Sequence, residues 1–66
     1  MMYTLHLLEG KEVVPYRIAE HSANTLFKSV GMKILTDLLF VYVYDGEEEQ
    51  QMLINRHLIV RINVSG

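Results

Sequence analysis

The chain has 66 residues, a formal net charge of −2 and no cysteine. A chain this short forms one small domain, residues 1–66, and buries only about 60% of its unfolded surface. Because disulfides and cysteine-ligated metal sites are excluded, we expect self-association to contribute to its stability. The negative net charge argues against a nucleic-acid-binding protein that relies on bulk positive charge.

The first part of the chain predicts a β-hairpin. Apolar and more polar residues alternate there, which is typical of a strand with one buried face. We expect strands over about residues 2–8 and 11–18, joined by a turn at Glu9 and Gly10. This turn would place Leu5 opposite Val14 and would gather the apolar residues on one face.

A short helix is predicted between residues 20 and 31. Four apolar residues follow the helical spacing i, i+3, i+4 and i+7: Ala23, Leu26, Phe27 and Val30. Ser22 is the expected N-cap residue, and Gly31 is the expected residue just after the helix. The alternative is a strand running from Leu26 toward residue 34. The glycine favours the helix.

The stretch from residue 38 to residue 64 predicts three more strands. Residues 38–44 are all apolar, and β-branched and aromatic residues dominate, as in a buried strand. Asp45 and Gly46 suit a two-residue hairpin turn, which would place Leu39 opposite Met52. A three-residue step at 55–57 would then return the last strand along the previous one, because only this length keeps one apolar face intact.

This register predicts an inner face and an outer face. The expected inner face forms the core and consists of Leu39, Val41, Val43, Met52, Ile54, Leu58, Val60, Ile62 and Val64. The expected outer face carries, among polar residues, the apolar side chains Leu38, Phe40, Tyr42, Tyr44, Leu53 and Ile59. So many clustered apolar residues require a cover, either the helix or another molecule. For another molecule, the contact residues would be Phe40, Tyr42, Tyr44, Leu53 and Ile59.

We expect neither an enzyme nor a cofactor. The hydroxyl-bearing residues lack the context of an activated nucleophile, and the histidines lack the spacing of metal ligands. Residues 45–49 contain an acidic cluster at the predicted hairpin tip: Asp45, Glu47, Glu48 and Glu49. Such a cluster is usually a solvated turn, and its functional alternative is a patch for a basic partner.

Two stretches resemble the Sm-like family of small β-barrels. Residues 5–13 resemble the first Sm motif, and residues 51–59 resemble the end of bacterial Sm-like RNA chaperones. In those chaperones a Gln-Met strand, a short Lys-His step and an Ile strand follow one another, and Arg56 takes the place of the lysine here. The resemblance implies a five-stranded SH3/Sm-like barrel, RNA contacts from Arg56 and His57 at a ring pore, and a hexameric ring.

The fold expected from the whole pattern is mainly β with one short helix, an α+β fold. It would be either the small barrel or a hairpin, helix and meander, and a β-grasp domain is a third candidate. No stretch is long and apolar enough to span a membrane, and a cytoplasmic location is expected.

Three functions are compatible with this sequence. The first is a non-enzymatic interaction module that self-associates through the outer face. The second is RNA binding through Arg56, His57 and Arg61, beside tyrosines on which bases could stack. The third is a small acidic regulator or inhibitor that docks on a host protein through its hairpin tip.

Overall fold

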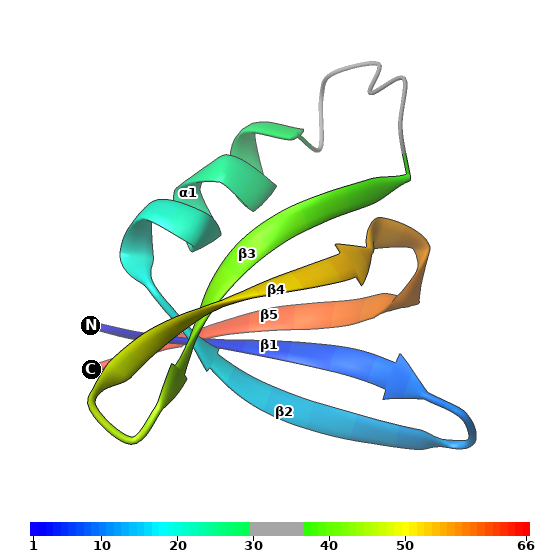
Figure 1. Ribbon diagram of the computed structural model, residues 1–66, viewed down its shortest axis with the longest axis horizontal. Coiled ribbons are helices and arrows are strands. Elements are labelled where there is room, and N and C mark those ends of the chain that lie inside the picture. Colours follow the sequence, from blue (N-terminus) through cyan, green and yellow to red (C-terminus); the bar gives the residue numbers. More distant parts are fainter. Residues whose placement is uncertain (30–36) are drawn as a thin grey trace.

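The computed structural model describes residues 1–29 and 37–66, and these form a small compact α+β fold (Figure 1). Its strands are β1 (Met2–Glu9), β2 (Glu12–Ile18), β3 (Leu38–Asp45), β4 (Glu48–Asn55) and β5 (Ile59–Ser65). The helix α1 (Glu20–Ser29) follows β2, and a 3₁₀ turn, η1 (Arg56–Leu58), separates β4 from β5. The described part of the chain is therefore mainly β with one α-helix, as the sequence predicts.

The strands form one antiparallel sheet in the order β4-β3-β2-β1-β5. The two outermost strands, β4 and β5, do not pair with each other, so the sheet is not closed into a barrel. The expected barrel is therefore wrong, and so is the meander in which β5 runs back along β4. The β-grasp candidate is wrong too, because that fold pairs its first and last strands in parallel, whereas β1 and β5 are antiparallel.

The turn η1 explains why β5 lies beside β1 and not beside β4 as predicted. This turn ends the β4 ladder at Asn55 and directs the chain away from β3, so that β5 pairs with β1. The sheet is strongly bent, and the β3–β4 hairpin lies across the ribbon formed by β1, β2 and β5 (Figure 1). Among the described residues, the ladder between β2 and β3 consists of a single pair, Ile18 and Val43.

Both hairpins have a register two residues away from the predicted one. Leu5 lies opposite Tyr16 instead of Val14, and Leu39 lies opposite Ile54 instead of Met52. In each turn the glycine occupies the first central position, with φ of 61° at Gly10 and 64° at Gly46. Since a shift of two residues preserves the alternation of a strand, the inner and outer faces of β1 to β4 stay as predicted.

The core lies inside the bend of the sheet. Its largest fully buried side chains are Leu5, Ile18 and Val41, which come from β1, β2 and β3. The helix adds Ala23 and Leu26 to this cluster, as predicted, whereas Phe27, which was predicted on the same face of the helix, is 44% exposed. The remaining buried members of the cluster are Tyr3, Leu7, Val43 and Ile54.

The predicted inner and outer faces of β5 are observed only in part. A bulge between His6 and Leu7 of β1 changes the phase of the pairing, so that Leu7 faces Ile59 while Leu5 faces Ile62. These two isoleucines pack against the core. Of the expected inner residues of this segment, Ile62 is therefore confirmed, whereas Leu58, Val60 and Val64 are exposed.

The start of the helix also differs from the prediction. The helix begins at Glu20, and the N–H of Ala23 donates to the carbonyl of Ala19 at 3.0 Å. Ser22 is therefore inside the helix and is not its N-cap. Its hydroxyl accepts a hydrogen bond from the backbone N–H of Tyr42 at 2.8 Å. Gly31 and Val30 lie outside the described residues.

Candidate interaction surface

The outer face of the β3–β4 hairpin carries an exposed apolar patch, which we call the outer patch: Phe40, Tyr42 and Leu53. Phe40 and Leu53 lie directly opposite each other across the two strands. Their side chains are 58% and 52% exposed. Leu38, at the start of β3, is half exposed on the same side. The hairpin therefore presents a row of large apolar side chains to solvent.

Strand alternation produces this patch. Val41 and Val43 point into the core, so their neighbours Phe40 and Tyr42 must point the other way. Polar residues at these positions would fold equally well into a strand with one solvated face. The apolar outer residues are therefore not explained by the chain's own core.

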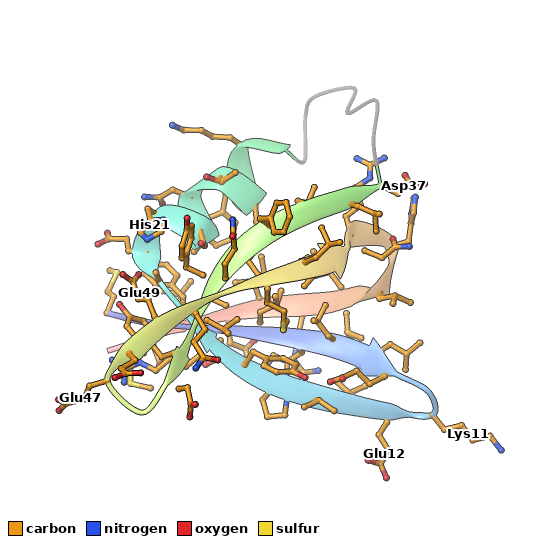
Figure 2. The ribbon with its side chains drawn as sticks, in the orientation of Figure 1. Lys11, Glu12, His21, Asp37, Glu47 and Glu49 are labelled. Atoms are coloured by element: carbon orange, nitrogen blue, oxygen red, sulfur yellow. The ribbon has the colours of Figure 1, made fainter. Side chains whose placement is uncertain are left out.

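The helix covers only one end of the outer face. The N–H of Ala19 donates to the carbonyl of Tyr42 at 3.0 Å, and the ring of His21 lies 5.1 Å from the ring of Tyr42. Figure 2 shows His21 beside Glu49, and the two side chains are 3.1 Å apart. Phe40 and Leu53 lie farther along the hairpin and stay exposed. The helix therefore covers the outer face only in part.

Two residues predicted to share this surface are only partly exposed. Tyr44 is half buried beneath Arg17 of β2, whose guanidinium group lies 4.8 Å from the centre of the tyrosine ring. Ile59 packs against the core from β5. The structure therefore brings together three of the five predicted contact residues, Phe40, Tyr42 and Leu53, in the outer patch.

The acidic hairpin tip is exposed, and part of its charge is engaged within the chain. All of its carboxylate-bearing residues are solvent-accessible, and Glu47 points away from the body of the molecule (Figure 2). Asp45 accepts a hydrogen bond from Gln50 at 3.3 Å, and Glu49 contacts His21. Glu47 and Glu48 provide the remaining carboxylates of the tip.

The residues considered for RNA binding lie at the opposite end of the hairpin. His57 is 2.8 Å from Asp37, and the Arg56 Nε lies 3.7 Å from the same carboxylate oxygen. A nucleic-acid phosphate would therefore compete with an acidic side chain for both cationic groups. Arg61 lies on β5 opposite His6, and Tyr44 pairs with Glu49 near the acidic tip, away from Arg56.

A groove of about 190 Å³ borders the second half of β4, and the sequence did not predict it. Its β4 wall is formed by Met52, Leu53, Ile54 and Asn55. On the other side lie Leu7 and Leu8 of β1, Tyr16 of β2 and Leu58 of η1, and Glu9 adds a carboxylate. The groove exists because β5 leaves β4, so no sequence signal along β4 indicated it.

Tyr16 connects this groove to the core. Its ring packs against the core cluster, and its hydroxyl donates a hydrogen bond to the carboxylate of Glu9. This hydrogen bond, followed by desolvation and the negative charge of Glu9, raises the pKa of Tyr16 above its ordinary value of 10.0. Tyr16 therefore stays a neutral hydrogen-bond donor throughout the physiological pH range.

Other kinds of site find no support in residues 1–29 and 37–66. These residues contain no group of three or more histidine and carboxylate side chains that could hold a metal ion. The helix that they form is too short to cross a membrane. No family model, curated protein or solved structure matches this chain. The outer patch and the groove beside β4 are the features from which a function can be argued.

Proposed function

We propose that this chain is a non-enzymatic interaction module that self-associates through the outer patch. The observation that supports this most strongly is the directly opposed pair Phe40 and Leu53, with both side chains more than half exposed on adjacent strands. Aromatic residues are enriched in the buried centres of protein interfaces. Burying such a pair in an interface would stabilise the complex, because the isolated chain leaves both side chains in contact with water.

A second copy of the chain is the partner proposed here. A chain of 66 residues without disulfides has a small core, and oligomerisation is a common way to stabilise such a domain. The outer patch contains no charged residue, so two copies can approach there without bringing like charges into contact. Glu49, next to the patch, is already in contact with His21.

Light scattering behind a sizing column tests this proposal. We expect the wild-type chain to elute as a dimer or larger species at micromolar concentration. Phe40→Ser should weaken association about tenfold or more, because truncating a central aromatic residue of an interface costs 2 kcal/mol or more. Val13→Ser is the matched control, since Val13 is 47% exposed on β2, away from the patch. A monomeric wild-type chain would overturn the proposal.

The other two functions are weaker proposals. RNA binding through Arg56, His57 and Arg61 would require RNA to displace Asp37 from the first two residues. Docking through the acidic tip would use Glu47 and Glu48, which are exposed. A gel shift with short single-stranded RNA, comparing the wild type with Arg56→Ala, tests RNA binding. A pull-down comparing the wild type with Glu47→Lys tests the tip.

A further inference from the structure

We propose that the two copies pair through β4, with strand β4 of one copy antiparallel to β4 of the other. This proposal rests on the proposed self-association. A two-fold axis would pass through the sheet at Leu53, and two sheets would join into one continuous sheet.

The two edges of the sheet differ in how well they resist added strands. Edge strands are commonly protected by bulges, charged residues or proline. The edge strand β5 has a bulge in its pairing with β1 and carries Arg61 in its middle. The edge strand β4 pairs with β3 without a shift from Asp45 through Leu38, and its residues 50–55 are uncharged. In the described part of the chain, β4 is the unprotected edge.

Pairing β4 with itself gives a closed dimer. A two-fold contact uses the same surface on both copies and ends at two subunits. Pairing β4 of one copy with β5 of the next would use two different surfaces and would continue into a ring or a filament. The bulge in β5 disfavours that second arrangement, because it interrupts a regular ladder.

The side chains select the register of the pairing. A two-fold axis perpendicular to the sheet places residues of the same face opposite each other, so it must pass through a residue. An axis at Gln51 would place Leu53 opposite Glu49, and an axis at Met52 would place Leu53 opposite Gln51. An axis at Leu53 places the two Leu53 side chains together and Met52 opposite Ile54. Only this last register matches apolar residues with apolar residues.

The same register extends the outer patch across the dimer. Because Phe40 lies opposite Leu53 within each copy, the row would read Phe40, Leu53, Leu53 of the second copy and Phe40 of the second copy. The register also brings Glu49, near the acidic tip of one copy, toward the η1 turn of the second copy, which carries Arg56 and His57. The acidic and basic ends of the hairpin would therefore complement each other, and this arrangement favours antiparallel pairing.

The groove beside β4 lies where the added strand would enter. Its β4 wall, from Met52 to Asn55, is the segment that the pairing uses, and the opposite wall contributes Leu7, Tyr16 and Leu58. The inward-facing side chains of the second copy would thus meet an apolar surface. The pairing fills space that the single chain leaves open.

Single cysteines test this pairing, because the chain has none of its own. Residues directly opposite in an antiparallel pair have Cα atoms about 4.5–5.5 Å apart, within the range of a disulfide. Leu53→Cys should therefore form a disulfide-linked dimer on mild oxidation. Gln51→Cys should not, since the two copies of residue 51 would lie about 13 Å apart along the strands. An equal mixture of Gln51→Cys and Asn55→Cys should form the mixed dimer.

The outcomes separate this inference from the proposed function. Cross-linking of Leu53→Cys and of the mixture, without cross-linking of Gln51→Cys alone, supports the pairing. Light scattering that shows a wild-type oligomer, together with no cross-link in Leu53→Cys or in the mixture, overturns the pairing and leaves self-association standing. A wild-type monomer overturns both. Equal cross-linking of all single-cysteine variants would show random collision and would also overturn the pairing.

Discussion

The two faces of the β3–β4 hairpin differ sharply in exposure although their residues alternate along the same strands. Val41 is 1% exposed and Ile54 is 4% exposed, whereas their neighbours Phe40 and Leu53 are among the most exposed apolar residues. Both sets are large and apolar, so composition alone does not distinguish them. The inner set is used by the chain's own core. Within residues 1–29 and 37–66, no element buries the outer set in this way, and this difference is the basis of the proposed self-association.

The adjacent residues Ile54 and Leu53 provide the largest test of this comparison. Ile54→Ala should lower the free energy of unfolding by about 2–5 kcal/mol, because it removes a buried side chain and leaves a cavity. Leu53→Ala should change the stability of the monomer by less than about 1 kcal/mol. It should, however, weaken self-association. Urea denaturation at low protein concentration measures the first two effects, and light scattering measures the third.

Equal losses of stability in the two alanine variants would contradict the distinction between the faces. Preserved association in Leu53→Ala would contradict the role of the outer patch. A loss of association in Ile54→Ala alone would not support it, because the lower stability of that variant can itself reduce association.

The contact between the helix and β3 defines where the outer patch ends. Ser22 is buried, and its hydroxyl accepts the N–H of Tyr42 at 2.8 Å. Ser22→Ala should therefore cost about 1–3 kcal/mol, because it leaves that N–H without its acceptor. Thr25→Ala is the control: its hydroxyl donates to the carbonyl of His21 on the exposed side of the helix, and we expect a change within about 0.5 kcal/mol. Thermal melts that rank the two variants equally would contradict this account.

Tyr16 provides the smallest and most local test, at the boundary between the core and the groove. Because the pKa of Tyr16 is raised, the stabilisation of the folded chain by the hydrogen bond from Tyr16 to Glu9 is fully present below pH 10.0. It is lost as the pH rises through the raised pKa. Glu9→Gln should return the pKa of Tyr16 toward 10.0, since the hydrogen bond to a carboxylate is its largest cause. Ultraviolet absorbance titration of both proteins measures this. Superimposable curves would show that the contact with Glu9 is absent in solution.

The inner and outer faces of β1 to β4 could be predicted from the sequence, but the register within each hairpin could not. A glycine at either central position of a two-residue turn allows positive φ, so the dipeptides Glu9-Gly10 and Asp45-Gly46 left the turn position undetermined. The observed turns place each glycine first, which shifts the register by two residues and keeps the faces. The alternation of side chains along each strand was therefore enough to predict Val41 and Ile54 in the core. The turn geometry determined which residues lie opposite them on the neighbouring strand.

The position of β5 could not be predicted from local pattern. The segment 58–64 has apolar residues at its even positions and the polar residues Arg61 and Asn63 at two of its odd positions, but alternation predicts only the faces of a strand and not the neighbour with which it pairs. The bulge at the level of His6 then places Ile59 and Ile62 on the core side. Both features depend on β1, which lies far away in the sequence. The outer patch was predictable because it depends only on β3 and β4, whereas the groove depends on where β5 goes.

Amide hydrogen exchange at low and high protein concentration tests the central claim most directly, because it locates any self-association along the chain. The account predicts that amides of β4, within residues 51–55, become more protected as concentration rises, while those of β5 do not change. Protection that is independent of concentration, or that increases along β5 and leaves β4 unchanged, would contradict it.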